Sequence, residues 1–81
     1  MRVLYFAWVR ERIGKGREEV ETSAATVADL VEELRAREDR YEAAFADMGA
    51  VRVAVDQVLT DLDAPIAGAR EVAFFPPMTG G

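Results

Sequence analysis

A chain of 81 residues has room for one small domain with a single hydrophobic core. Apolar types form 51% of the residues and charged types 31%, which is an ordinary balance for a folded globular protein. The chain has no Cys and no His, so disulfides, the usual zinc sites and the commonest general base are excluded. The net charge of −5 opposes binding to nucleic acid or anionic membranes and favours a basic protein partner.

The N-terminal segment is apolar and rich in β-branched and aromatic types, which predicts a strand over residues 1–9. Gly14 and Gly16 supply a turn, and residues 17–22 form a weaker second strand, so together they predict a hairpin. The first segment is too short to span a bilayer, and no basic leader precedes it. We therefore expect a cytoplasmic protein.

The clearest helix begins after Thr26, which is a good N-cap with Asp29 at the third helical position. Apolar residues at spacings of three and four line one face of this helix, and charged residues occupy the others. The apolar set is Val27, Leu30, Val31 and Leu34. A second, shorter helix is predicted from Asp39, with the same spacing through Met48 and its end at Gly49.

The C-terminal third predicts strands. Val51, Val53 and Val55 alternate on one face, and Asp56 and Gln57 form a turn toward a short strand at residues 58–59. A final strand over residues 71–75 ends at two prolines, which cannot donate to a sheet. The order of elements is α+β, with one mixed sheet curled over one main helix. We expect a domain over residues 1–75 and an extended tail over residues 76–81.

The unusual feature is the C-terminus, where two phenylalanines and two prolines precede Met78, Thr79, Gly80 and Gly81. The prolines give a stiff exit from the domain, and glycines without Cβ atoms pass through a channel too narrow for other residues. The tail thus presents the terminal carboxylate of Gly81 to another protein's active site. Side-chain catalysis is disfavoured, because the few hydroxyl residues near position 26 have capping roles.

Three segments of the chain resemble the small subunit of molybdopterin synthase, a family of ubiquitin-like sulfur carriers. They are Val-Leu-Tyr-Phe-Ala with Val-Arg-Glu within residues 3–11, Val-Ala-Val-Asp-Gln at 53–57, and Glu-Val-Ala-Phe-Phe-Pro-Pro-Met-Thr-Gly-Gly at 71–81. The resemblance covers essentially the whole chain. It implies a β-grasp fold.

The resemblance also implies a reaction cycle in which this chain is not an enzyme on its own. An E1-like adenylyltransferase would use ATP and Mg to convert the Gly81 carboxylate to an acyl-adenylate, and sulfur transfer would make a thiocarboxylate. The tail, residues Pro76, Pro77, Met78, Thr79 and Gly80, would insert into the synthase large subunit, in a heterotetramer, to pass sulfur to a pterin precursor. No cofactor or metal would be bound by the chain itself.

The docking surface is expected on the open face of the sheet. The predicted first strand places Val3, Tyr5, Ala7 and Val9 on one face and Leu4, Phe6 and Trp8 on the other. The resemblance implies that Phe6, Leu59 and Phe75 meet the large subunit, and exposed apolar patches on small domains are typical of protein contacts. Arg10 either hydrogen-bonds the tail or a partner, or is simply solvated.

Two positions depart from the family pattern, because Asp56 stands where members often carry Asn and Arg70 where they carry an acidic turn residue. Three other functions remain open. A carrier for thiamine-thiazole synthesis shares the Gly-Gly end but not the doubled Phe and Pro. A protein modifier would form isopeptide bonds through Gly81, and a passive β-grasp interaction domain would not need the tail.

Overall fold

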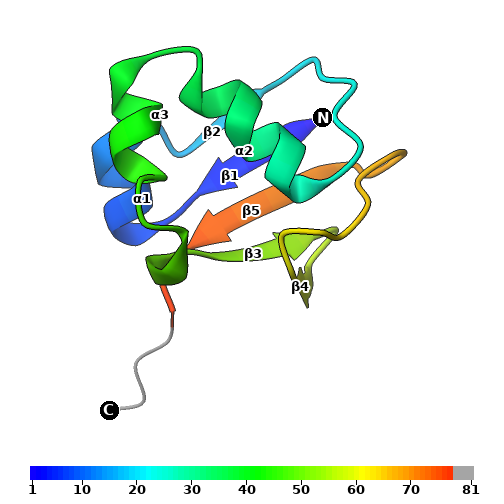
Figure 1. Ribbon diagram of the computed structural model, residues 1–81. Coiled ribbons are helices and arrows are strands. Elements are labelled where there is room, and N and C mark those ends of the chain that lie inside the picture. The colour runs from blue at the N-terminus through cyan, green and yellow to red at the C-terminus, as the bar shows by residue number, and fades with distance from the viewer. Residues whose placement is uncertain (78–81) are drawn as a thin grey trace.

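The structure, a computed structural model, describes residues 1–77. In this part of the chain five strands form one mixed sheet, and the helices pack on one of its faces (Figure 1). The strands are β1 (Arg2–Tyr5), β2 (Arg17–Glu19), β3 (Arg52–Val55), β4 (Val58–Thr60) and β5 (Glu71–Phe75). The helices are α1 (Ala7–Ile13), α2 (Val27–Arg35) and α3 (Asp39–Ala44), and a 3₁₀ turn, η1 (Met48–Ala50), precedes β3.

The first and last strands lie side by side in the middle of the sheet, whose order is β2-β1-β5-β3-β4. β1 runs parallel to β5, with Arg2 opposite Glu71 and Tyr5 opposite Phe74. The pairs β1–β2, β3–β5 and β3–β4 are antiparallel. This mixed sheet with helices across one face is a β-grasp, so the predicted α+β class is confirmed.

The prediction of a strand over residues 1–9 is wrong beyond Tyr5. The chain turns at Ala7, whose φ of 52° lies in the left-handed region, and continues as α1. Val9 and Ile13, four residues apart on this helix, are fully buried in the core. The prediction that Ala7 and Val9 lie on one face of a strand and Trp8 on the other is therefore also wrong, because these residues follow the helical period.

A helix thus separates the two N-terminal strands, so they do not form the simple hairpin that the sequence predicts. Gly14 ends α1 with a φ of 91°, and its N–H donates to the carbonyl of Arg10 at 2.7 Å. β2 is shorter than predicted and stops at Glu19. Val20 follows it as a buried core residue, and its N–H donates to the Met1 carbonyl at 2.8 Å.

The main helix, α2, forms where its apolar period predicts. The Thr26 hydroxyl accepts a hydrogen bond from the N–H of Asp29 at 3.2 Å, as an N-cap does. All four residues of the predicted apolar face are buried, and Leu30 has no exposed surface. The N–H of Ala28 donates to the Leu62 carbonyl at 2.8 Å, so the loop after β4 satisfies another donor at the helix start.

The second predicted helix is also present but shorter than expected. α3 has Glu38 at its N-cap and ends before Phe45, whereas a helix through Met48 was predicted. Gly49 belongs to η1 instead, because the Asp47 carboxylate accepts from its N–H at 3.0 Å and caps a new turn. The predicted end of α3 at Gly49 is therefore wrong.

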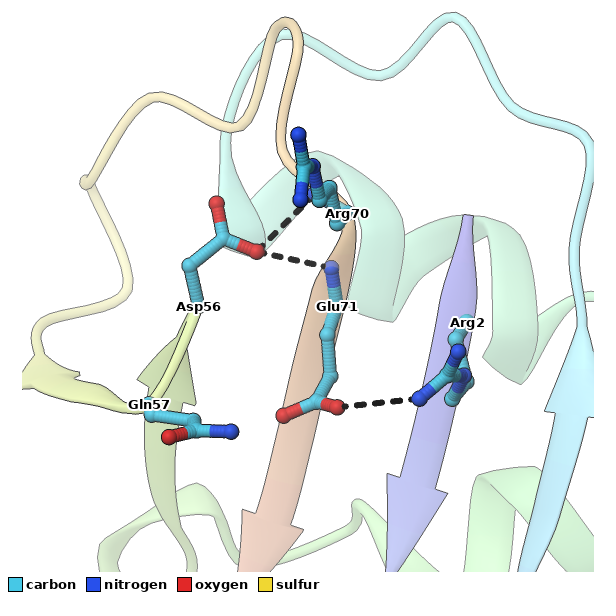
Figure 2. A pocket seen from close by; sticks show the side chains of 5 residues that line it. All are labelled: Arg2, Asp56, Gln57, Arg70 and Glu71. Atoms are coloured by element: carbon cyan, nitrogen blue, oxygen red, sulfur yellow. Dashed lines mark hydrogen bonds and ion pairs between the residues drawn. The ribbon is translucent and has the colours of Figure 1, made fainter.

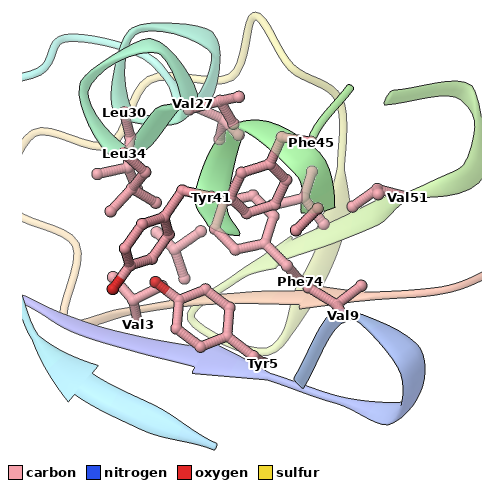
Figure 3. Packing of buried hydrophobic residues seen from close by; sticks show 14 of the residues in the cluster. Val3, Tyr5, Val9, Val27, Leu30, Leu34, Tyr41, Phe45, Val51 and Phe74 are labelled. Atoms are coloured by element: carbon pink, nitrogen blue, oxygen red, sulfur yellow. The ribbon is translucent and has the colours of Figure 1, made fainter. Parts of the chain in front are cut away.

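The core lies between the helices and the sheet, where aromatic rings from β1, α3 and β5 meet (Figure 3). The ring of Phe74 stacks near Tyr5 at a centroid distance of 6.2 Å and contacts Phe45 at 5.0 Å. Tyr5 and Tyr41 are 1% exposed, so both phenol groups are withdrawn from bulk water. These side chains hold the helical layer against the centre of the sheet.

Candidate docking face and tail exit

The tail leaves the domain directly from the central strand of the sheet. β5 ends at Phe75, and the half-buried Pro76 and Pro77 carry the chain away from the arrowhead end of that strand (Figure 1). The predicted tail positions Met78, Thr79 and Gly80, and the predicted reactive position Gly81, lie outside the described residues.

The sheet face opposite the helices has an apolar row across its middle. The strand registers place Leu59 beside Ala54, Ala54 beside Ala73, and Ala73 beside Leu4. Leu4 lies between the buried Val3 and Tyr5, and Ala73, which is 7% exposed, lies between the fully buried Val72 and Phe74. The row therefore lies on the face that no helix covers (Figure 1). Leu59 is 67% exposed.

Two aromatic residues extend this row toward the tail exit. Phe75 lies two residues beyond Ala73 on β5 and is half-buried. Phe6 is 47% exposed, and its N–H donates to the Phe74 carbonyl at 3.0 Å, which keeps the extended chain beside β5 for one more residue. We call this set the open-face patch, and its members are Leu4, Phe6, Ala54, Leu59, Ala73 and Phe75.

The structure thus brings together the three residues that the resemblance assigned to partner binding. Phe6, Leu59 and Phe75 lie on the open face, and none of them is a core residue. Trp8, predicted beside them, is on α1 and packs against the core instead. The patch and the base of the tail form one continuous surface, which suits a partner that contacts both.

Arg10 lies at the edge of the open-face patch. Its side chain passes over Gly16 so closely that a Cβ added there would lie 3.3 Å from Nε. Together with Leu4, Phe6 and Arg17 it borders a surface depression of about 520 Å³. Within residues 1–77 its guanidinium forms no hydrogen bond or ion pair, so whether it contacts the tail or a partner stays a prediction.

The opposite end of the sheet holds the two departures from the family pattern (Figure 2). Asp56 and Gln57 form a two-residue turn with φ values of 48° and 71°, which suits Asp or Asn. One oxygen of Asp56, Oδ1, accepts from the N–H groups of Arg70 and Glu71 at 2.9 and 3.0 Å. An Asn carbonyl could accept both bonds, so Asp56 preserves the turn and lies far from the tail.

A cluster around Glu18 was not singled out from the sequence. The hydroxyls of Tyr5 and Tyr41 both donate to Glu18 Oε2 at 2.7 Å, while Lys15 and Arg37 lie 3.5 and 3.7 Å from Oε1. The cluster ties the edge strand β2 to β1 and to the helical layer. A sequence signal existed, because Glu18 is two residues before Val20 and so lies on the core face of the strand.

The pKa values in this cluster reflect burial and shared hydrogen bonds. Burial opposes ionisation of Glu18, but hydrogen bonds from Tyr41 and Tyr5 outweigh it and lower the pKa of the carboxyl. Burial and the hydrogen bond to Glu18 raise the pKa of Tyr41 to about 12 and that of Tyr5 further above its ordinary value. Glu18 is therefore ionised and both phenols are neutral at physiological pH, so the cluster stabilises the fold without offering a proton donor.

Within residues 1–77, no group of acidic side chains is arranged to hold a metal ion. In the same range, no helix is long and apolar enough to cross a membrane.

Comparisons with known proteins agree with this geometry. The ThiS family model matches residues 3–81. The chain is 43% identical over 81 residues to the molybdopterin synthase sulfur carrier subunit of Escherichia coli, covering 100% of this chain and 99% of that protein. It is 37% identical over 81 residues to the Haemophilus influenzae protein of the same name, with the same coverage. The crystal structure of SAMP1 from Haloferax volcanii superposes with a TM-score of 0.78 at 29% identity, covering 100% of this chain and 98% of that one.

Proposed function

The chain belongs to the ThiS family, and from that premise we propose that it carries sulfur as a thiocarboxylate on Gly81 and delivers it within a molybdopterin synthase complex. Its role as a sulfur carrier in molybdenum cofactor biosynthesis rests on similarity along the full length of curated carriers. The observation that supports delivery is the continuity of the open-face patch with the tail exit at Phe75 and Pro76.

The first step is activation of the terminal carboxylate. An E1-like adenylyltransferase would join the Gly81 carboxylate to the AMP portion of ATP, with Mg, and release pyrophosphate. A free carboxylate is inert toward nucleophiles, whereas the acyl-adenylate has a good leaving group. A sulfur donor would then displace AMP and leave sulfur on the acyl carbon, so this chain supplies the acyl group while its partners supply ATP, Mg and the catalytic residues.

The second step is delivery. The large subunit of the synthase would cover Phe6, Leu59 and Phe75 on the open-face patch, while Pro76 and Pro77 direct the tail into its active site. The thiocarboxylate sulfur would bond to the pterin precursor and form an acyl thioester. Water would then cleave the acyl–sulfur bond, which leaves the sulfur on the pterin and returns the Gly81 carboxylate. We propose a heterotetramer of two large and two small subunits, located in the cytoplasm where ATP is available.

The test is reconstitution with the E1-like partner, ATP and a sulfur donor. Intact protein should gain the mass of one sulfur in place of one oxygen, and fragmentation should locate it at Gly81. A chain lacking Gly81 should keep the fold and melting behaviour, because the core residues of the described chain end at Phe74, yet should not support sulfur transfer. Molybdopterin formation by the shortened chain would mean that the tail is irrelevant, as for a passive interaction domain.

Two other measurements separate the remaining alternatives. Adducts in cell extracts that join a lysine of another protein to Gly81 would identify a protein modifier. Sulfur loading without molybdopterin formation, but with thiazole synthesis, would identify a carrier for thiamine.

A further inference from the structure

The basic side chains that lack an acidic partner are concentrated around the open-face patch. Ion pairs in residues 1–77 engage Arg2, Lys15, Arg35, Arg37 and Arg40. The remaining arginines are without a carboxylate within 4.0 Å in that range. Three of them, Arg10, Arg17 and Arg52, border the patch, so cationic side chains surround it although the net charge of the chain is −5.

Arg52 and Arg17 lie on opposite sides of the patch. Arg52 on β3 pairs directly with Phe75, the last residue of β5 before the tail. Arg17 on β2 pairs with Leu4. Both side chains are exposed, and the guanidinium of Arg52 bonds only to the carbonyls of Gly49 and Val51 in the described chain, at 3.2 and 3.3 Å.

Two carboxylates of the open face lie at its other end and are already engaged. Glu71 lies 3.6 Å from Arg2, and Glu19 lies 3.6 Å from the N-terminal ammonium. Asp61 follows Thr60, which pairs with Val53, and so lies at the Arg52 end of the face. Glu11 follows Arg10 on α1. Within residues 1–77 neither carboxylate forms an ion pair. The tail end of the open face therefore presents apolar atoms bordered by three arginines that form no ion pair within residues 1–77.

We infer that the partner that receives the tail presents carboxylates to Arg17 and Arg52 around an apolar centre that covers Phe75. The inference rests on the proposed function, since it concerns the partner of that docking face. It reverses the expectation of a basic partner drawn from the net charge of −5. The local charges decide contact because charges more than about 8–10 Å away are screened at physiological ionic strength.

The test is the association rate with the large synthase subunit, measured by stopped flow across a range of NaCl concentrations. Arg17→Glu and Arg52→Glu should each slow association roughly tenfold or more at low salt, and the difference should shrink as salt rises. Arg70→Glu is the matched control, because it makes the same change in net charge at the far end of the sheet. Its association rate should stay within about twofold of wild type.

Several results would overturn the inference. Faster association of Arg17→Glu and Arg52→Glu would mean a basic partner, and equal slowing by Arg70→Glu would mean that only net charge matters. If Phe75→Ala weakens binding while both charge reversals bind like wild type, the proposed docking stands and the acidic partner does not. If the wild-type protein does not bind the large subunit, the proposed docking and the acidic partner are both wrong.

Further controls test whether the variants fold and whether the effect depends on a carboxylate of the large subunit. Thermal melts establish that the variants fold, and Arg52→Gln replaces the reversal if Arg52→Glu does not, with a smaller slowing in the same direction. Substituting Lys for a large-subunit carboxylate should restore fast binding to Arg52→Glu. Wild-type dimers that dissociate on Arg17→Glu would show that a second copy of the chain occupies the patch, which would overturn the inference.

Discussion

Glu18→Gln tests whether the cluster of Glu18, Tyr5 and Tyr41 holds the edge strand to the helical layer. Both phenol hydroxyls donate to the same carboxylate oxygen at 2.7 Å. Hydrogen bonds to a charged acceptor contribute about 1.5–3 kcal/mol and neutral ones about 0.5–1.5 kcal/mol, so neutralisation should cost about 1 kcal/mol per bond. The new amide N–H₂ would also face Lys15 and Arg37, so we expect a loss of about 2 kcal/mol in the free energy of unfolding.

Urea denaturation measures this loss, with Glu19→Gln as the matched control. Glu19 is the next residue, its side chain is 77% exposed, and its contact with the N-terminal ammonium at 3.6 Å should contribute less than about 1 kcal/mol. A double-mutant cycle with Tyr41→Phe should give a coupling energy of about 1 kcal/mol with Glu18→Gln. If Glu18→Gln costs no more than Glu19→Gln, the cluster does not stabilise the fold.

The same variant fixes the sign of a pH effect. The folded-state pKa of Glu18 is lowered, so its contribution is present above the ordinary carboxyl value of 4.5 and is lost as the pH falls through the lowered value. Wild type should therefore lose stability on acidification below about pH 4.5 more steeply than Glu18→Gln. Parallel curves would mean that Glu18 does not titrate differently in the folded state.

Three further predictions follow from the core, the patch and the tail. Leu30→Ala should cost about 2–5 kcal/mol of unfolding free energy by urea titration, because Leu30 is fully buried, and a cost typical of a surface change would mean that the packing is wrong. Phe75→Ala should weaken large-subunit binding by about 2 kcal/mol in calorimetry while the protein stays folded, and outright unfolding would make Phe75 a core residue. Gly80→Val keeps the terminal carboxylate but adds a branched side chain, so it should block sulfur loading in the mass-spectrometric assay; normal loading would argue against a narrow channel.

Local patterns in the sequence determined several elements because their signals do not depend on distant residues. The α2 face repeats at helical spacing behind the Thr26 cap, and both features are present in the structure. The Asp56–Gln57 turn and the end of β5 at Phe75 are likewise local, since the first reflects backbone preference and the second is followed by two prolines that cannot donate to a sheet. The C-terminal Phe-Phe-Pro-Pro-Met-Thr-Gly-Gly sequence indicated the family without any structure.

The start of α1 depended on tertiary structure. An apolar run through Val9 fits a buried strand or a buried helix equally well by composition. The break at Ala7 occurs where the Phe6 N–H bonds the Phe74 carbonyl, a residue far away in the sequence. The spacing of Val9 and Ile13, followed by Gly14 at the C-cap, was the local sign of a helix.

The charge around the docking face and the Glu18 cluster also depended on tertiary structure. Net charge is a sum over the chain and carries no position, whereas strand register places Arg52 beside Phe75 and Arg17 beside Leu4. Register equally decides that Glu18 meets Tyr41 from a helix more than twenty residues away in the sequence. Sequence determined which residues are available, and long-range pairing decided which of them share a surface, because only pairing brings distant segments within contact distance.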